Sequence, residues 1–107
     1  YIVVLNDTLI SGNYFCDDGI AMQSILLGAT EAGYGGCIIH SVNRNKLRQL
    51  LNLSEQYDIL YVVALGKPKE TVVLEEMQND EIKYWRDENQ VHHVPKRTLD
   101  EIILEVK

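Results

Sequence analysis

The stretch DDGIAMQSILLGATEAGYGGCIIH, residues 17–40, decides the fold. Its first part, residues 17–33, is apolar on nearly every side, which is typical of a central, buried helix. Asp17 or Asp18 can accept hydrogen bonds from the free amides at the helix start, and Gly33 can end the helix in a left-handed conformation. Two neighbouring carboxylates would also suit acid-base catalysis, but capping already explains them at this position.

Strands and helices alternate on both sides of this helix. The apolar run at residues 2–5 predicts a strand, and residues 59–65 predict the strongest strand, which should lie in the middle of a sheet. Residues 37–40 predict a short buried strand. Asn43 can cap a following helix whose apolar face carries Leu47, Leu50 and Leu51. This order of elements predicts a mixed α/β fold.

The C-terminal third is more polar. Residues 67–90 are rich in charge, and residues 83–94 predict a hairpin or an extended arm. Thr98 and Glu101 have the spacing of a capping box, which predicts a final helix. Its apolar stripe would be formed by Leu99, Ile102, Ile103 and Val106.

Composition limits the class of protein. The 107 residues are 46% hydrophobic and 24% charged, which is ordinary for one soluble domain. A net charge of -6 disfavours nucleic acid as a partner, and no apolar run is long enough to span a membrane. Cys16 and Cys37 lack CxxC spacing and are predicted to be buried thiols, which favours a reducing, cytoplasmic setting. Because the sequence opens inside a predicted strand, we expect it to be a piece of a longer protein.

Two places could carry chemistry. Lys96 and Arg97 precede the predicted cap at Thr98, so two cations and the free amides of a helix start would form an anion site, unless both cations are simply solvated. His40 and Ser41 follow a buried strand at a turn of the kind where α/β proteins place ligand contacts, although a lone histidine is more often structural.

Metal sites and common nucleotide sites are not indicated. His92 and His93 are adjacent, so on a strand they point to opposite faces and cannot bind one metal together. The sequence contains no GxGxxG, GxxxxGK[ST], GxSxG or HExxH motif.

Four ordered blocks of the sequence resemble the nitroreductase family of flavoproteins. Residues 18–37 resemble the central helix of that family, and residues 46–53 resemble the short helix after its flavin turn. Residues 62–68 are similar to its late strand with a Gly-x-Pro stop, and residues 95–102 resemble its C-terminal basic motif and helix.

This resemblance implies an α/β/α sandwich around a mostly antiparallel sheet, of which residues 1–107 would be the C-terminal portion of a single domain. It implies an FMN enzyme that takes hydride from NAD(P)H and reduces nitroaromatics, quinones or similar small acceptors in a ping-pong cycle, working as a homodimer. By position, Ile39, His40 and Ser41 would lie beside the flavin ring, where His40 could donate a proton. Arg97 and Lys96 would contact the flavin phosphate.

A second hypothesis belongs to another class. The family's N-terminal half has no counterpart in this sequence, so the domain could instead be a non-catalytic module that binds flavin or a partner chain.

Overall fold

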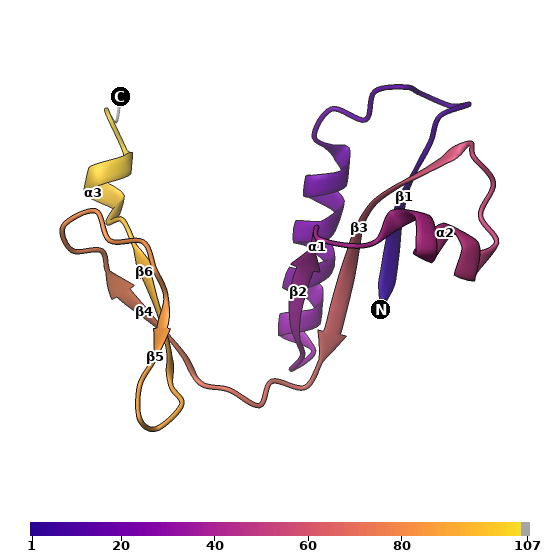
Figure 1. The fold of residues 1–107 in the computed structure, drawn as a ribbon. Coiled ribbons are helices and arrows are strands. Elements are labelled where there is room, and N and C mark those ends of the chain that lie inside the picture. The colour runs from indigo at the N-terminus through magenta and orange to yellow at the C-terminus, as the bar shows by residue number, and fades with distance from the viewer. Residues whose placement is uncertain (106–107) are drawn as a thin grey trace. The chain divides into compact units, whose positions relative to one another are not determined.

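The computed structural model describes residues 1–105, and the chain divides into two compact units, Tyr1–Lys67 and Pro68–Lys107 (Figure 1). Both units combine helices with a three-stranded sheet, so the prediction of a mixed α/β fold is confirmed. The prediction that residues 1–107 are the C-terminal portion of one domain stays a prediction.

Unit 1 is built on an antiparallel sheet. Its strands are β1 (Ile2–Asp7), β2 (Gly35–Ile39) and β3 (Tyr57–Gly66), in the order β1-β3-β2. The central strand β3 carries most of the buried core of the described residues: Ile59, Val62 and Val63. The prediction of a strong central strand is confirmed, and its ten residues extend the apolar run at both ends.

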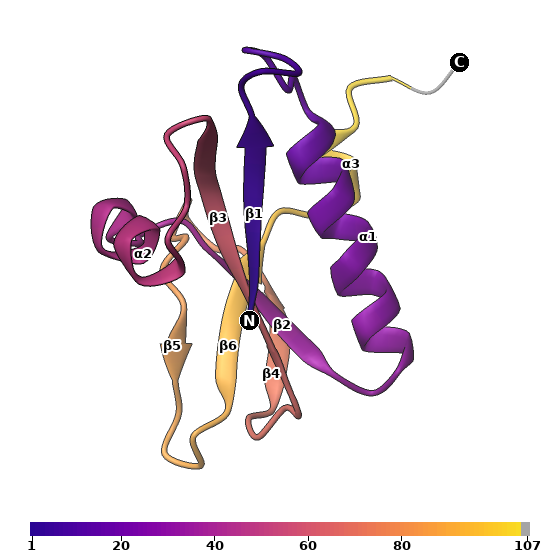
Figure 2. The ribbon, with the colours of Figure 1, turned by 90° about the vertical axis from the view of Figure 1, so that its right-hand side faces the viewer.

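The two helices of unit 1 cover opposite faces of this sheet (Figure 2). Helix α1 (Asp17–Glu31) buries Met22 and packs against β2 and β3, while α2 (Arg44–Leu51) lies over the face that carries Val62. Helix α1 packs closely on position 36, where a Cβ would overlap a terminal methyl of Leu26, so a larger residue there would force the Leu26 side chain to shift. Unit 1 is therefore a three-layer arrangement of helix, sheet and helix.

The ends of the helices follow local rules only in part. Gly33 ends α1 with a φ of 78°, and the amides of Gly33 and Tyr34 donate to the carbonyls of Thr30 and Ala29, as predicted for a glycine stop. Capping by Asp17 or Asp18 is wrong, because Cys16 is the N-cap and no side chain caps the helix. The two carboxylates lie in the first turn, where the positive end of the helix dipole favours them.

Two predictions of burial are wrong. Helix α1 contacts the sheet along one face only, so apolar side chains on its other faces are exposed, Ile20 to 64% and Leu27 to 61%. Cys16 and Cys37 are free but exposed, because Cys16 precedes the first turn of α1 and Cys37 lies on the edge strand β2.

Unit 2 contains a smaller mixed sheet. Strands β4 (Val72–Glu76), β5 (Trp85–Arg86) and β6 (His92–Lys96) lie in the order β4-β6-β5, with β4 parallel and β5 antiparallel to β6. The β5–β6 pair confirms the predicted hairpin, whereas β4 was not predicted.

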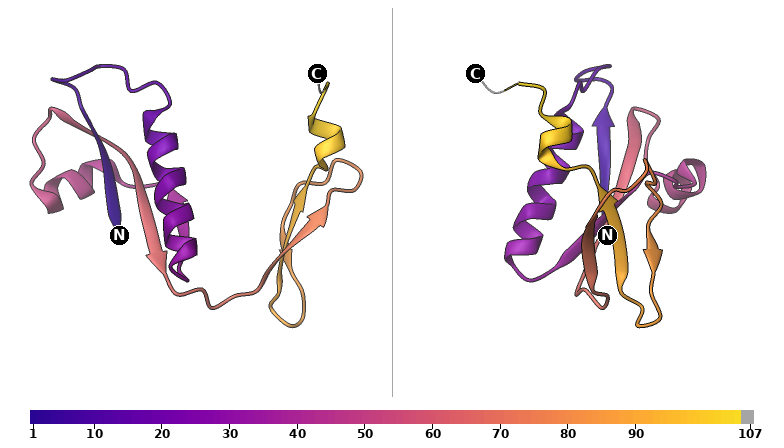
Figure 3. Two further views of the ribbon diagram at one scale, coloured as in Figure 1. Left: turned by 180° about the vertical axis from the view of Figure 1, so that it is seen from behind. Right: turned by 90° about the vertical axis from the view of Figure 1, so that its left-hand side faces the viewer.

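Helix α3 (Leu99–Ile102) follows β6 directly (Figure 3). It begins where the capping box predicts, but Ile103 is already extended, and Val106 lies outside the described residues. In residues 1–105, no helix has the length and apolar character needed to cross a bilayer.

Candidate functional site

A groove of about 410 Å³ opens in unit 1 at the end of β2. The loop before α1, the turn after β2, helix α2 and strand β3 all contribute to it. Its lining is mostly polar and aromatic: Tyr14, His40, Arg44, Asn45, Arg48, Asp58, Ile59, Leu60 and Tyr61. Two of the predicted site residues, His40 and its neighbour Ser41, therefore lie at or beside a real concavity.

Arg44 stabilises the floor of this groove. Its Nε and Nη2 atoms donate to the carbonyls of Ile59 and Leu60, each at 2.9 Å. Consecutive carbonyls of a regular strand point in opposite directions, so one guanidinium could not bind both. The register between β1 and β3 shifts at this point, since Val4 pairs with Tyr61 but Leu5 pairs with Ile59, which makes Leu60 a bulge residue. The bulge brings both carbonyls within reach of Arg44.

Arg48 is also engaged by the backbone. Its guanidinium donates to the carbonyls of Ser54 and Tyr57, the latter at 2.7 Å, and Glu55 lies 3.9 Å from its Nε. The two cations of the groove thus connect α2 to strand β3 and to Ser54, which precedes that strand. Each guanidinium uses two of its five N–H donors in these bonds, so the carbonyls hold both cations in place without using all of their donors.

Aromatic and acidic groups line the side of the groove nearest α1. The rings of His40 and Tyr61 lie 5.5 Å apart at a tilt of 54°. The carboxylate of Asp18 accepts from the hydroxyl of Tyr61, and this bond together with the negative charge raises the pKa of Tyr61 above its usual value. Tyr61 is therefore held as a neutral donor between α1 and the turn that carries His40.

The predicted flavin turn, Ile39 to Ser41, is continuous and accessible. Ile39 also lines an apolar groove of about 290 Å³ between the sheet and α2, together with Val42, Leu47, Leu50 and Val62. His40 and Ser41 are exposed, and the backbone amide of Ser41 has no acceptor among residues 1–105. The turn thus offers a free backbone donor beside an apolar surface.

Lys96 and Arg97 lie in unit 2. Both are exposed, and the guanidinium of Arg97 is 4.0 Å from the carboxylate of Asp80. The amide of Thr98 donates to Glu101 at 2.8 Å, so the capping box occupies one donor at the start of α3. The predicted anion site stays a prediction. The two cations remain available, but they lie in a different unit from residues 39–41.

Sequence reasoning missed Arg44 and Tyr61. Arg44 follows the cap Asn43 and occupies the first position of α2, where the helix dipole disfavours a cation. A cation at such a position indicates that its side chain binds another part of the chain, and this was the sequence signal that could have identified Arg44. Tyr61 gave no signal, because it is one aromatic residue within an apolar run. Within the described part of the chain, no group of His, Cys, Asp and Glu is arranged to hold a metal.

Comparison with known proteins gives one consistent result. The model of the nitroreductase family matches residues 15–67. A solved structure of a nitroreductase family protein from Clostridium novyi NT is similar at 36% identity with a TM-score of 0.57. The match covers 63% of this chain and 42% of that chain, so this chain spans less than half of the similar protein. No curated protein matches the sequence significantly.

Proposed function

Residues 15–67 of this chain belong to the nitroreductase family, and from this premise we propose that the chain forms part of an FMN-dependent oxidoreductase. The observation that carries the proposal is the accessible turn at residues 39–41, which lies inside the matched segment and presents an amide without a partner in residues 1–105. The proposed donor is NADH or NADPH, and the proposed acceptors are nitroaromatics, quinones or similar small molecules.

The residues of the turn fit a flavin ring. An isoalloxazine has an apolar ring system and an edge of nitrogen and carbonyl acceptors, so it requires apolar contact together with backbone or side-chain donors. Ile39 supplies an apolar surface, and the Ser41 amide supplies a donor directly beside it. His40 is exposed at the same turn and could hold a proton near the ring edge.

The proposed phosphate contacts are Lys96 and Arg97. A guanidinium matches phosphate geometry, and the single competing carboxylate recorded for Arg97 is 4.0 Å away and 90% exposed. A weak, solvated pair of this kind costs little to replace by a phosphate. Arg97 and Lys96 would therefore act as charges that hold the flavin phosphate.

When bound, FMN would supply the hydride chemistry, accepting electrons from the nicotinamide and passing them to the second substrate. The chain's own part is to bind and orient. The Ser41 amide would donate to the ring edge, Ile39 would exclude water from the ring, and Tyr61 would limit the motion of His40 through the contact of their rings. We also propose a homodimer as the working unit and the cytoplasm as its location.

The test is the absorbance of the chain between about 300 and 550 nm, measured before and after incubation with FMN and desalting. Retained flavin bands support the proposal. Arg97→Ala should then weaken FMN binding by about 1.5 to 3 kcal/mol, the range for a charge-assisted hydrogen bond. Lys83→Ala is the matched control, since it removes a cation from another segment of unit 2. Equal FMN affinity in the Arg97 and Lys83 variants would remove Arg97 from the site.

The second candidate is a non-catalytic flavin-binding or partner-binding module. Anaerobic mixing of the FMN-loaded protein with NADH and with NADPH separates the two candidates. Bleaching of the oxidised flavin bands requires hydride transfer and supports the enzyme, whereas a flavin that stays oxidised with both donors supports the module.

A further inference from the structure

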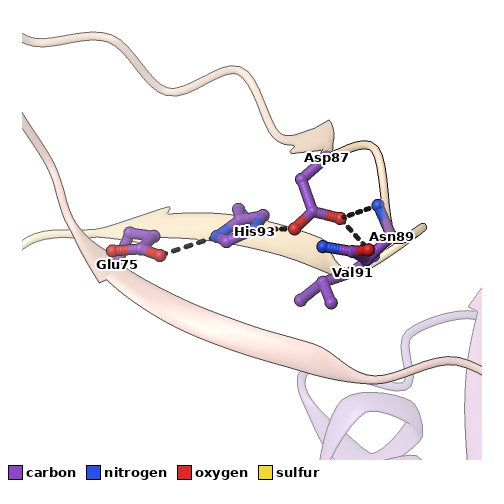
Figure 4. A network of polar contacts seen from close by, with 5 residues as sticks. All are labelled: Glu75, Asp87, Asn89, Val91 and His93. Atoms are coloured by element: carbon purple, nitrogen blue, oxygen red, sulfur yellow. Dashed lines mark hydrogen bonds and ion pairs between the residues drawn. The ribbon is translucent and has the colours of Figure 1, made fainter.

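Unit 2 contains a polar network centred on His93, shown in Figure 4. Nδ1 of His93 lies 2.7 Å from Oε1 of Glu75, and Nε2 lies 3.7 Å from Oδ2 of Asp87. The imidazole stacks on the indole of Trp85, with the ring centroids 4.9 Å apart and the planes within 3° of parallel. His93 thus has a carboxylate at each ring nitrogen and an aromatic ring on one face.

The two contacts of His93 are not equivalent. A carboxylate can only accept, so in a neutral imidazole the proton must lie on Nδ1, where Glu75 is within hydrogen-bond distance. Nε2 is then a bare acceptor that faces a second carboxylate. It is buried and has no hydrogen-bond partner among the residues that the structure describes, and its separation of 3.7 Å from Asp87 is too long for a hydrogen bond. This is the arrangement expected when two acceptors face each other.

The carboxylate of Asp87 has one oxygen that can accept a hydrogen bond from a protonated Nε2 of His93. Its Oδ1 atom accepts from the amides of Asn89 at 2.9 Å and Val91 at 2.8 Å, which fixes the carboxylate within the turn between β5 and β6. Its Oδ2 atom has no such donor and is directed at His93. The two amides, with that of Val91 contributing most, and the nearby imidazole hold the pKa of Asp87 below its usual value. The carboxylate of Asp87 therefore keeps its charge to a lower pH than an ordinary aspartate does.

We propose that His93 is a proton-operated clamp on the turn at residues 87–91. When the ring takes up a proton from solvent, Nε2 donates to Oδ2 of Asp87. The turn then moves toward β6, because the separation of 3.7 Å between these two atoms must shorten to hydrogen-bond distance. Nδ1 keeps its hydrogen bond to Glu75, so the protonated ring joins β4, β6 and the turn. Loss of the proton returns Nε2 to a bare acceptor and releases the turn.

The surroundings of His93 leave Glu75 and Asp87 as the groups that control this step. Glu75 faces it from β4 and Asp87 from the turn, while β5 contributes the uncharged Trp85. His92 belongs to a separate group, because its Nδ1 faces Glu70, which also pairs with Arg86 at 2.7 Å. This group provides a matched control on the neighbouring residue. The clamp lies wholly within unit 2 and does not depend on the proposed flavin chemistry.

Trp85 is the only tryptophan in the chain, so its fluorescence reports on the stacked ring. We expect the emission of the full chain to fall as the pH is lowered, because an imidazolium stacked on an indole withdraws electron density from it. His93→Phe keeps an aromatic ring at the position and should abolish the transition, while His92→Phe should retain it. Asp87→Asn should move the transition to lower pH, since an amide does not favour the charged ring.

The wild-type chain gives a second readout that needs no variant to fold. In ¹⁵N NMR spectra, the ring nitrogens of His93 and the backbone amides of Asn89 and Val91 should shift with one common midpoint, equal to that of the fluorescence. A fluorescence transition that persists in His93→Phe would overturn the clamp. So would turn amides whose shifts do not follow the ring of His93, because the proton would then not be coupled to the turn.

Discussion

Replacement of Arg44 by lysine tests whether the floor of the unit 1 groove depends on a cation that binds two carbonyls at once. The guanidinium donates to two consecutive carbonyls, those of Ile59 and Leu60, at 2.9 Å each. An ammonium group can follow one of them but lacks the fixed fork that reaches both. One charge-assisted hydrogen bond is worth about 1.5 to 3 kcal/mol, and because Arg44 is half-buried, we expect Arg44→Lys to lower the free energy of unfolding by about 1 to 2 kcal/mol.

Arg44→Met removes both hydrogen bonds and should cost about twice as much as Arg44→Lys. The assay is urea denaturation of the chain followed by far-ultraviolet circular dichroism, in which a shift of the midpoint at constant slope reports stability. Lys46→Met is the matched control on the same helix and should change stability by no more than about 0.5 kcal/mol. If Arg44→Lys unfolds at the wild-type urea concentration, the two-carbonyl interaction does not stabilise the bulge, and the reasoning is refuted.

Three further perturbations test other parts of the structure. Gly36→Ala should destabilise unit 1 by about 1 to 3 kcal/mol in urea denaturation, because a Cβ would overlap Leu26 and come within 2.7 Å of Leu65, whereas Gly12→Ala, with open space around it, should have little effect. The lowered pKa of Glu70, caused first by Arg86, and that of Asp87 mean that both carboxylates stabilise unit 2 above their unfolded pKa values. This stability should be lost as the pH falls through the lowered pKa values. Circular dichroism should therefore show a shallower acid transition in a Glu70→Gln, Asp87→Asn double variant. An unchanged transition would contradict the stabilising role of the two carboxylates. The raised pKa of Tyr61 predicts that part of the stability of unit 1 is lost as the pH rises through this pKa. In absorbance titrations at about 295 nm, Asp18→Asn should make one tyrosine ionise at lower pH, and Tyr61→Phe should remove the tyrosine that ionises late in the wild type.

Signals that are local in the sequence predicted local structure well. Asn43 was recognised as a cap, and its carboxamide accepts from the amide of Lys46 at 3.0 Å. Gly33 was recognised as a helix stop, and its φ of 78° explains why glycine suits that position. The apolar run that became β3 was placed correctly at the centre of a sheet. Each of these features depends on residues that are close together in the chain.

Features that depend on distant pairing were not predictable in this way. Strand β4 pairs in parallel with β6 across about twenty residues, and no turn signal marks a pairing of that kind. The bulge at Leu60 arises from the register of β1 against β3, which the apolar pattern of either strand alone does not specify. The exposure of α1 was not predicted from its sequence. A helix that is apolar on all sides can be buried on all sides, but this pattern does not specify which elements of the chain pack against it.

The candidate flavin turn calls for a test of its backbone, because the group without a partner is the amide of Ser41 and not its side chain. Ser41→Ala keeps the amide, and we expect it to bind FMN as the wild type does. Ser41→Pro removes the amide hydrogen and should weaken FMN binding about ten-fold, the value of one hydrogen bond of about 1.4 kcal/mol.

The measurement is titration of FMN fluorescence with each variant, with circular dichroism to establish that the proline variant keeps the wild-type helix and strand content. Loss of affinity in the alanine variant would assign the contact to the Ser41 hydroxyl. Equal affinities in a folded proline variant and the wild type would show that the free amide is not a flavin contact. The proposed function would then rest on Lys96, Arg97 and the matched segment alone, because the turn would have lost the donor that makes it fit a flavin edge.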